Sequence, residues 1–487
     1  MLMVLTLTAC IPLEDAPVPT PSVNPVIATL LQAKTAGVAT GTPAMNAGRT
    51  QTISPAATQP VAFQQRSRYT LKVTFDYSAN RLQVVEEVAF INRVTQPLDE
   101  VLLVVEANRI QGVFNLKVLT WSDGSKIKGY LLEGARLRIP LLKPLTPAGV
   151  VNLHLEYELK PSNQPGPLSN SGRQINLVDW YPYAPPYHSG QGWLAYEPAG
   201  VGEHLVYDTA DFDVSIRLLN PPENLKLAAS TLAETIEGGY RYHAQDVRNF
   251  SWSASTDYVV REEVHGKTRV QAYVFPEDAD IVDVVMQTML KALDVYEQLY
   301  SPYPRPVLVM VEAGFFDGLE TDGLFFLGQQ YFVSYDGTPE SYLVALSAHE
   351  VAHQWWFALV GNDQAMEPWL DEALCTYSEA LFYEHAYPEE TAWWWQFRVN
   401  RFEPKGRVGS SIYDFFGFRA YVNATYLRGA EFLQVVRVRM GDKAFFEFLQ
   451  DYIHRYQDNL ASADGFFATL LVHSKTGFED LQAEYFR

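Results

Sequence analysis

The chain has 487 residues, of which 47% are hydrophobic and 13% aromatic, enough to fill the cores of two or three packed domains. Its 37 Lys and Arg residues are outnumbered by 57 Asp and Glu residues, and a net charge of −20 would repel phosphate backbones, which excludes nucleic acid as a partner. With two cysteines, Cys10 and Cys375, no disulfide framework can be inferred.

The first ten residues, MLMVLTLTAC, form an apolar run that is too short to span a bilayer. The run ends in Leu7-Thr8-Ala9-Cys10 and resembles the lipobox of bacterial lipoproteins, in which the cysteine is lipidated. The resemblance implies a signal segment over residues 1–10, a lipid on Cys10, and an extracytoplasmic location at the cell surface or in the periplasm. Since no Lys or Arg precedes Cys10, an accidental apolar N-terminus is the alternative.

Residues 11–66 differ from the rest of the chain in composition. Stretches such as PVPTPSVNP and ISPAATQP are rich in Pro, Thr, Ala and Ser, and aromatic residues are nearly absent. Because such a composition buries too little surface to order itself, we predict a disordered tether. No later segment has eighteen consecutive apolar residues, so we expect contact with a membrane only through the N-terminal lipid.

From residue 67 to 262, hydrophobic residues recur at every second position, a period typical of strands buried on one face. Turn-forming stretches such as NRVTQP and NPPEN separate the runs. The pattern predicts an all-β domain, a sandwich or an open saddle, with an irregular aromatic loop around Trp180 to Trp193. The alternating positions are Tyr69, Leu71, Val73, Phe75, Leu82, Val84, Val88, Phe90, Val151, Leu153, Leu155, Tyr157, Leu159, Phe212, Val214, Ile216 and Leu218.

Residues 263–487 change to a helical period, which indicates a second domain. Pro306–Ala313 is expected to be a buried strand. Helices are predicted over Tyr342–Val360 and Trp369–Tyr387, and Pro368 suits the start of the second because its missing N–H costs nothing there. The chain is therefore predicted to be a multidomain α+β protein, with an all-β domain followed by a mainly helical one.

The stretch HEVAHQWWFALVGNDQAMEPWLDEALCTY begins with His349 and His353, four residues apart. Positions i and i+4 share a helix face, so both imidazoles can reach one ion while Glu350 lies one step round, near a metal-bound water. Roughly 0.01 accidental HExxH matches are expected in such a chain, and requiring a glutamate at one downstream position lowers this below about one in a thousand. Two core histidines with charged neighbours are the alternative.

Catalytic zinc commonly takes two His and one Glu and keeps a fourth position open. The third ligand would be Glu372, nineteen positions beyond His353, in the first turn of the next helix. The loop GNDQAME is suited to turn the chain back between them. The sequence therefore predicts one catalytic Zn²⁺ per chain, bound by His349, His353 and Glu372.

These motifs resemble those of the zinc aminopeptidases related to aminopeptidase N, a branch of the gluzincins. HEVAH, the eighteen-residue gap and WLDEALCTYSEA are similar to that family's HExxH, its gap and its WLNEGFA-type segment. The resemblance covers about Tyr69 to Arg487 and implies a β saddle followed by a thermolysin-like domain. It also leads us to expect a form without the family's large helical C-terminal domain.

Two further segments match the family. A GxMEN-type segment carries a glutamate that binds the substrate's α-amine, and the nearest match, DGLET, implies this role for Glu320, although a carboxylate in a Gly-rich loop can also cap a turn. A tyrosine before a Lys/Arg-Gly-Ala helix stabilises the oxyanion, and Tyr426 precedes Arg428-Gly429-Ala430. With 28 tyrosines in the chain, a merely packed Tyr426 is the alternative.

The resemblance implies an aminopeptidase that removes N-terminal residues from peptides with a free N-terminus. Glu350 would take a proton from the zinc-activated water and deliver it to the leaving amine. Another gluzincin hydrolase, an endopeptidase or an epoxide hydrolase, is the alternative if Glu320 does not face the zinc. A non-enzymatic, lipid-tethered zinc-binding module is another, but a structural site has no use for the general base Glu350.

Other residues around the motif also have structural explanations. Cys375, on the predicted helix of Glu372, is expected to be a small buried hydrophobe. Asp371 and Glu379 can orient a zinc ligand or lie on a solvated helix face. Trp355 and Trp356 are expected to pack in the core.

Overall fold

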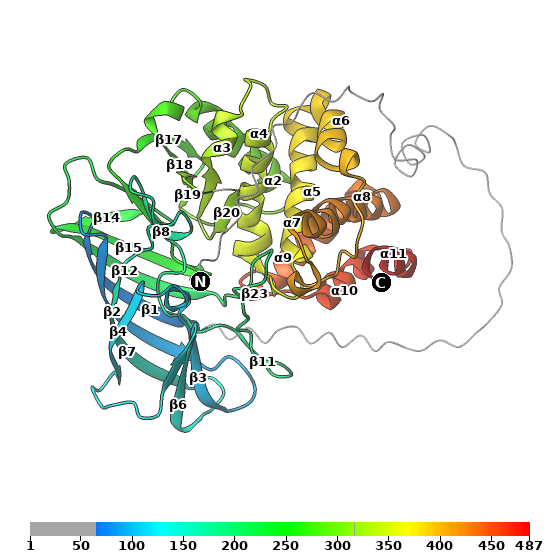
Figure 1. Cartoon of the computed structure of the whole chain (residues 1–487). Coiled ribbons are helices and arrows are strands. Elements are labelled where there is room, and N and C mark those ends of the chain that lie inside the picture. The colour runs from blue at the N-terminus through cyan, green and yellow to red at the C-terminus, as the bar shows by residue number, and fades with distance from the viewer. Residues whose placement is uncertain (1–64, 316) are drawn as a thin grey trace, which may run out of the picture. The chain divides into compact units, whose positions relative to one another are not determined.

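The computed structural model describes residues 65–315 and 317–487 (Figure 1). It confirms the predicted fold class, an N-terminal all-β domain followed by a mainly helical domain. The predicted signal segment, Cys10 and nearly all of the predicted tether lie outside the described residues. Within the described part of the chain, no helix combines the length and the apolar character needed to cross a membrane.

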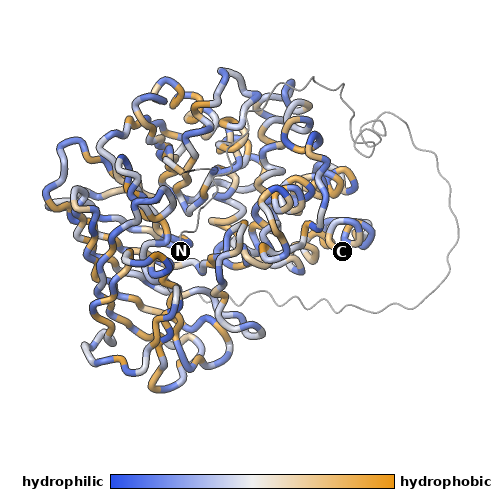
Figure 2. The backbone as a smooth tube through the Cα atoms, viewed as in Figure 1, coloured by the Kyte–Doolittle hydropathy of each residue, from blue (hydrophilic) through white to orange (hydrophobic). Residues whose placement is uncertain are grey.

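The β domain is built on a seven-stranded sheet with the order β14-β15-β12-β1-β2-β7-β4. In β1, Tyr69, Leu71, Val73 and Phe75 are all buried, because alternate side chains of a strand point to one face. Figure 2 shows hydrophobic and hydrophilic residues alternating along these strands. Their bounds are β1 Ser67–Asp76, β2 Arg81–Ile91, β4 Phe114–Trp121, β7 Val150–Leu159, β12 Ala210–Leu218, β14 Ala233–Ile236 and β15 Gly239–Val247.

Smaller sheets complete the β domain, with the orders β13-β16-β9-β8, β3-β6-β5 and β10-β11. The predicted irregular loop is confirmed: between β9 and β12 only the two-residue strands β10 and β11 form. The bounds are β3 Leu98–Val104, η1 Glu106–Arg109, β5 Leu131–Glu133, β6 Arg136–Leu145, β8 Leu168–Asn170, β9 Ile175–Leu177, β10 Tyr187–His188, β11 Gly192–Trp193, β13 Lys226–Ala229 and β16 Trp252–Ser255.

The mainly helical half begins with a five-stranded sheet, β17-β18-β19-β21-β20. β18, β19 and β21 run parallel, and α2 makes the crossover between β18 and β19. β20 pairs antiparallel with β21 at the edge. The predicted domain boundary at 262/263 lies within β17. The bounds are β17 Val259–His265, β18 Thr268–Val274, η2 Pro276–Asp278, α2 Val282–Leu299, β19 Val307–Ala313, β20 Gly318–Thr321 and β21 Leu324–Gly328.

Two buried helices form the centre of the mainly helical half. α4 (Tyr342–His353) begins at Ser341, whose side chain caps the N–H of Val344, and α5 (Trp369–Ala386) begins after Pro368. α4 packs against α2 and α5, and nearly all its residues are buried. The predicted helix up to Val360 is only partly regular, because after His353 the turns widen into the π-helix η3 (Gln354–Leu359). Buried Trp355 and Trp356 pack there, as expected.

The remaining helices follow α5 towards the C-terminus, coloured yellow to red in Figure 1. η8 is another π-helix, and it continues directly into α8. The remaining bounds are α3 Gln329–Val333, β22 Val360–Gly361, η4 Pro388–Glu390, α6 Thr391–Trp394, η5 Trp395–Val399, η6 Asn400–Phe402, η7 Ile412–Asp414, α7 Phe418–Tyr421, η8 Val422–Leu427, α8 Arg428–Met440, α9 Asp442–Tyr456, β23 Asn459–Leu460, α10 Ala463–His473 and α11 Glu479–Phe486.

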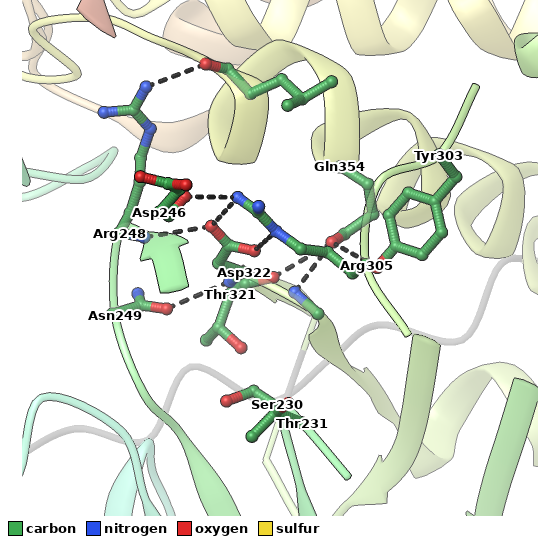
Figure 3. A network of polar contacts seen from close by, with 12 residues as sticks. Ser230, Thr231, Asp246, Arg248, Asn249, Tyr303, Arg305, Thr321, Asp322 and Gln354 are labelled. Atoms are coloured by element: carbon green, nitrogen blue, oxygen red, sulfur yellow. Dashed lines mark hydrogen bonds and ion pairs between the residues drawn. The ribbon is translucent and has the colours of Figure 1, made fainter. Parts of the chain in front are cut away.

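A buried arginine joins the β domain to the mainly helical half (Figure 3). Arg248 follows β15, and its guanidinium donates to the carbonyl oxygens of Phe357, Leu359 and Asn459 at 2.5, 3.0 and 2.9 Å. It leaves no room for a side chain at Gly361, where a Cβ would lie 2.4 Å from its Cζ. The guanidinium thus provides hydrogen bonds to two carbonyl groups of the π-helix η3.

The same network holds the edge hairpin β20–β21 in place (Figure 3). Asp322 accepts hydrogen bonds from the guanidinium of Arg305 on both carboxylate oxygens, at 2.8 and 2.9 Å. It also accepts one from the backbone N–H of Arg248 at 3.0 Å. Gln354 accepts from the N–H of Gly323 at 2.8 Å and donates to the carbonyl of Thr321 at 3.1 Å. Because Gln354 directly follows His353, the hairpin and the end of α4 are held at a fixed distance.

Candidate active site

A cavity of about 300 Å³ collects the predicted site residues. They come from segments far apart in the sequence: α4, α5, the edge strand β20, the π-helix η8 and the β domain. The polar side chains that line it are Glu203, Asp317, Glu320, Tyr331, Tyr342, His349, Glu350, His353, Glu372, Arg398, Arg419 and Tyr426.

The three predicted zinc ligands converge on one point. Nε2 of His349 lies 3.3 Å from Oε2 of Glu372, and Nε2 of His353 lies 3.7 Å from the same oxygen. Two ligands bound at 2.0–2.1 Å to a tetrahedral zinc ion lie about 3.3 Å apart. The spacing of these atoms therefore suits zinc, and their helices α4 and α5 are packed together.

The unpaired polar atoms and the charges of the site also fit a bound cation. Oε2 of Glu350 is buried and has no partner among residues 65–315 and 317–487, although buried polar atoms are nearly always paired. Burial and neighbouring His349 hold the pKa of His353 well below its usual range, so this imidazole is neutral, the form that binds metal. The donor set of two imidazoles and one carboxylate is that of a catalytic zinc site.

Glu379 fixes the orientation of His349. Its Oε1 lies 2.8 Å from Nδ1 of His349, which directs Nε2 towards Glu372. The carboxylate is itself held by the guanidinium of Arg398 at 2.9 and 3.0 Å and by Nε1 of Trp394 at 3.0 Å. Although burial opposes ionisation, Arg398 and His349 keep the pKa of Glu379 below its usual range. Glu379 is therefore a charged orienting residue, one of its two predicted interpretations.

Asp371 and Cys375 have different surroundings. Asp371 accepts the backbone N–H of Glu372 at 2.7 Å and so supports the first turn of α5. The Sγ of Cys375 comes within 4.8 Å of ligand atoms of both His349 and His353 and is fully buried. Because Cys375 does not line the cavity and burial raises the pKa of its thiol, Glu372 is the better third ligand.

Glu350 lies beside the ligands and against the backbone of Gly318. A Cβ at position 318 would lie 1.9 Å from Oε1 of Glu350, so a larger residue there would displace this carboxylate. Burial raises the pKa of Glu350 well above its usual range, and Glu372 adds to the shift. A carboxyl group with raised proton affinity and one unpaired oxygen is suited to accept a proton.

A second carboxylate cluster occupies the cavity beside Glu350. Glu320 lies in the edge strand β20, not in a loop, because the tight turn at Asp322 and Gly323 extends the β20–β21 pairing to it. The amide of Gln364 donates to Glu320 at 2.9 Å and to Glu203 at 2.6 Å. Burial, together with the neighbouring carboxylates, raises the pKa of both glutamates, so the cluster favours a bound cation.

Tyr426 reaches the ligand cluster from η8. Its hydroxyl donates to Oε1 of Glu372, and its ring lies parallel to that of His349 at 6.0 Å between centroids. Burial and the charge of Glu372 raise its pKa well above the usual range, so the hydroxyl keeps its proton and acts as a donor. Its place in a π-helix, next to the ligands, matches the frequent use of such turns at functional sites.

Sequence reasoning missed several residues at or beside this cavity, among them Glu203, Gln364 and Arg419. Glu203 follows an irregular stretch of the β domain and carries no motif. Gln364 lies in the GNDQAME loop, whose position between the two ligand segments was a usable signal. Arg419 lies seven residues before Tyr426 and also lines the cavity. The three predicted residues outside the ligand set, Glu320, Glu350 and Tyr426, do share the cavity with the histidines.

Fold and site together define a gluzincin-type domain, with HExxH on one helix and a glutamate on the next. Residues 282–485 match the family model described as the peptidase family M1 domain. Curated relatives include aminopeptidase M1-B of Oryza sativa subsp. japonica, 25% identical over 253 residues, and aminopeptidase N of Lactobacillus delbrueckii subsp. lactis, 22% identical over 283 residues.

These alignments cover 47% and 52% of this chain but only 28% and 33% of the relatives, so the chain spans about a third of their length or less. Among solved structures, an M1 zinc metallopeptidase of Deinococcus radiodurans superposes with a TM-score of 0.61 at 19% identity, covering 87% of this chain and 94% of that one. The likeness extends through both halves and confirms the predicted fold.

Proposed function

We propose that the protein is a zinc-dependent aminopeptidase. The observation that carries the proposal is the composition of one cavity: the His349, His353 and Glu372 donor set, the unpaired carboxyl of Glu350, and a separate carboxylate cluster at Glu203 and Glu320. The first two elements suit hydrolysis. The third suits recognition of an ammonium group next to the scissile bond.

His349, His353 and Glu372 would hold the zinc ion, with Glu379 orienting His349. A zinc ion bound there supplies Lewis acidity, which polarises the scissile carbonyl and lowers the pKa of a water molecule. Glu350 accepts the proton of the attacking water on its free oxygen and passes it to the leaving amine. The Tyr426 hydroxyl donates a hydrogen bond to the developing oxyanion.

The α-amine of the substrate would occupy the Glu203 and Glu320 cluster. An ammonium group has three donors, and two carboxylates with raised proton affinity can accept from it. Fixing the amine fixes the scissile bond one residue from the N-terminus, which distinguishes an aminopeptidase from an endopeptidase. The name aminopeptidase borne by the curated relatives supports this reading.

The competing functions lose support for specific reasons. An endopeptidase or epoxide hydrolase has no need of the amine cluster, yet Glu320 lines the same cavity as the histidines. A non-enzymatic zinc-binding module would be expected to close the fourth position with another ligand, whereas Glu350 remains unpaired within the described residues. Both alternatives are tested by the experiment below.

The test compares one peptide with a free or an acetylated N-terminus, using zinc-loaded protein and Glu350→Gln as the blank. We expect cleavage of the free peptide one residue at a time and none of the acetylated peptide. Glu320→Gln should lower kcat/KM for the free peptide by about 10- to 100-fold, since it weakens a charged hydrogen bond. Cleavage of both peptides at equal rates would instead identify an endopeptidase, and cleavage of neither would favour the binding module.

We also propose that the protein is lipid-anchored on the extracytoplasmic side of a bacterial membrane, through Cys10. The lipobox-like Leu7-Thr8-Ala9-Cys10 and the Pro- and Thr-rich composition of residues 11–66 support this proposal. In a bacterial host, wild-type protein should incorporate labelled fatty acid and sediment with membranes. Cys10→Ala should do neither, and equal labelling of both proteins would contradict the anchor.

A further inference from the structure

The charges that line the active-site cavity are unevenly distributed. Carboxylates predominate, at Glu203, Asp317, Glu320, Glu350 and Glu372, and the two arginines differ in their surroundings. Arg398 is buried and paired with Glu379 at 2.9 and 3.0 Å. Arg419 is exposed, and within the described residues no carboxylate pairs with it.

Arg419 is held in place by an aromatic ring. Its guanidinium lies over the ring of Phe402, with Cζ 4.4 Å from the centroid. This contact orients the side chain and leaves its N–H groups free to donate. The ring face attracts the positive charge of the guanidinium but accepts no hydrogen bonds from the N–H groups that lie in the guanidinium plane. In a chain of net charge −20, an arginine at a cavity without an acidic partner is suited to bind an anionic group of a ligand.

The position of Arg419 in the helix sets the distance to the reacting bond. α7 continues into η8, and Arg419 precedes Tyr426 by seven residues, which corresponds to about 10 Å at most along the helix. An extended peptide advances about 3.3–3.6 Å per residue. The axial spacing of the two backbone positions therefore corresponds to about three residues of an extended peptide, which suits a short substrate that reaches from the carbonyl near Tyr426 to a group bound by Arg419.

Arg419 also lies apart from the amine cluster. A guanidinium within 4.0 Å of Glu203 or Glu320 would form an ion pair with it, and the described residues show no such pair. The cavity thus offers carboxylates at one place and a guanidinium at another. A short peptide carries the complementary charges, an ammonium group at its first residue and a carboxylate at its last.

Building on the proposed aminopeptidase activity, we propose that Arg419 binds a carboxylate two or three residues beyond the scissile bond, and so makes short peptides with a free C-terminus the preferred substrates. The same chemistry is offered by an acidic side chain in a longer peptide. Arg419 is then a specificity-determining residue, whereas zinc ligation and proton transfer stay with the residues described above.

The experiment compares trialanine with trialanine amide, which differ only in the terminal carboxylate, and adds Ala-Ala-Asp amide to separate a side-chain carboxylate from a terminal one. Wild-type protein, Arg419→Gln, Arg419→Lys and Arg401→Gln are assayed after zinc loading. Arg401→Gln is the matched control, because Arg401 lies over the same Phe402 ring with Cζ 4.6 Å from its centroid but does not line the cavity.

We expect wild-type protein to cleave trialanine with a kcat/KM about 10- to 100-fold above that for its amide, the range of one charged hydrogen bond. Arg419→Gln should remove this preference by slowing trialanine only, Arg419→Lys should keep part of it, and Arg401→Gln should keep all of it. If Ala-Ala-Asp amide is cleaved as fast as trialanine, the site binds carboxylates in general. If it is cleaved as slowly as trialanine amide, the site binds only the C-terminal carboxylate.

A binding measurement separates this proposal from the proposed activity. Calorimetric titration of trialanine and its amide into zinc-loaded Glu350→Gln protein, with and without Arg419→Gln, reports on the carboxylate without any cleavage. Tighter binding of the free acid that depends on Arg419 would support the site even if no peptide is hydrolysed. Equal binding of acid and amide, or equal loss of both in Arg419→Gln, would overturn it.

Discussion

Two buried polar clusters meet at the edge hairpin β20–β21, and they balance their charges differently. In the network of Figure 3, Asp322 is paired with Arg305, and the guanidinium of Arg248 is surrounded by carbonyl oxygens. Two residues away, Glu320 shares the cavity with Glu350 and Glu372 and has no arginine partner among the described residues. Burial and the neighbouring carboxylates therefore raise the pKa of Glu320, while the charge of Asp322 is compensated by a cation.

The difference separates the roles of the two clusters. Buried charges that are paired and fully hydrogen-bonded hold segments in place, and removing one partner is costly. Buried carboxylates without a counter-charge destabilise the empty protein and favour binding of cations, here a metal ion and an ammonium group. The network around Asp322, in which the charges are paired, is the matched network, and the carboxylates of the cavity are the unmatched cluster. The matched network supports the unmatched cluster, because Asp322 and Gln354 fix the strand of Glu320 and the end of α4.

The largest effect is expected from Glu350→Gln, which removes the proton acceptor from the unmatched cluster. Turnover should fall by roughly 10² to 10⁴-fold, the usual contribution of a general base. Zinc content, measured by elemental analysis, should stay at one per chain. The unfolding temperature should not fall, because the substitution removes a buried charge that has no partner. A marked loss of stability would show that the two clusters do not differ as proposed.

Arg305→Met makes the corresponding change in the matched network. It leaves Asp322 charged, fully buried and without its cation, so the free energy of unfolding should fall by about 3–5 kcal/mol in urea titrations. Arg261→Met, which removes exposed ion pairs with Glu263 and Asp283, is the control and should cost about 1 kcal/mol or less. Equal effects of the two substitutions would refute a structural role for the network.

Tyr426→Phe tests the donor at the rim of the ligand cluster. The hydroxyl contributes mainly in the transition state, so kcat should fall by about 10²-fold or more while KM changes little. Zinc content should be unchanged, because Tyr426 contacts Glu372 through a hydrogen bond and is not itself a ligand. A loss of zinc with unchanged specific activity of the loaded fraction would place Tyr426 in metal retention instead.

Glu312 is a buried carboxyl in neither cluster, and the smallest effect is expected there. Burial raises its pKa from 4.5 to about 8, although the N–H of Phe275 donates to it at 2.7 Å. Because the folded-state pKa is the higher one, its contribution to stability is complete below pH 4.5 and is lost as the pH rises through 8. The melting temperature of the wild type should fall more between pH 6 and 9 than that of Glu312→Gln. An equal fall in both proteins would contradict this.

The sequence predicted the parts of the site that depend on local geometry. His349 and His353 lie four residues apart on one helix, and Glu372 lies in the first turn of the next, as the helical period and Pro368 indicated. The strand residues of β1, β2, β7 and β12 were predicted from their period of two. The predicted helix through Val360 does extend to Leu359, but as a π-helix from Gln354 on. The sequence did not predict this change, because the pairing of Arg248 with η3 carbonyls is a contact over more than a hundred residues.

The sequence by itself determined the elements and the metal-binding motif, because hydrophobic periods, caps and i to i+4 spacing act within a few residues of the chain. The tertiary structure alone decided which distant groups meet: Glu203 with Glu320 through Gln364, Glu379 with His349, and Arg419 at the same cavity. Such contacts follow from how β20, α4, α5 and η8 pack around one core, and no local pattern encodes that packing.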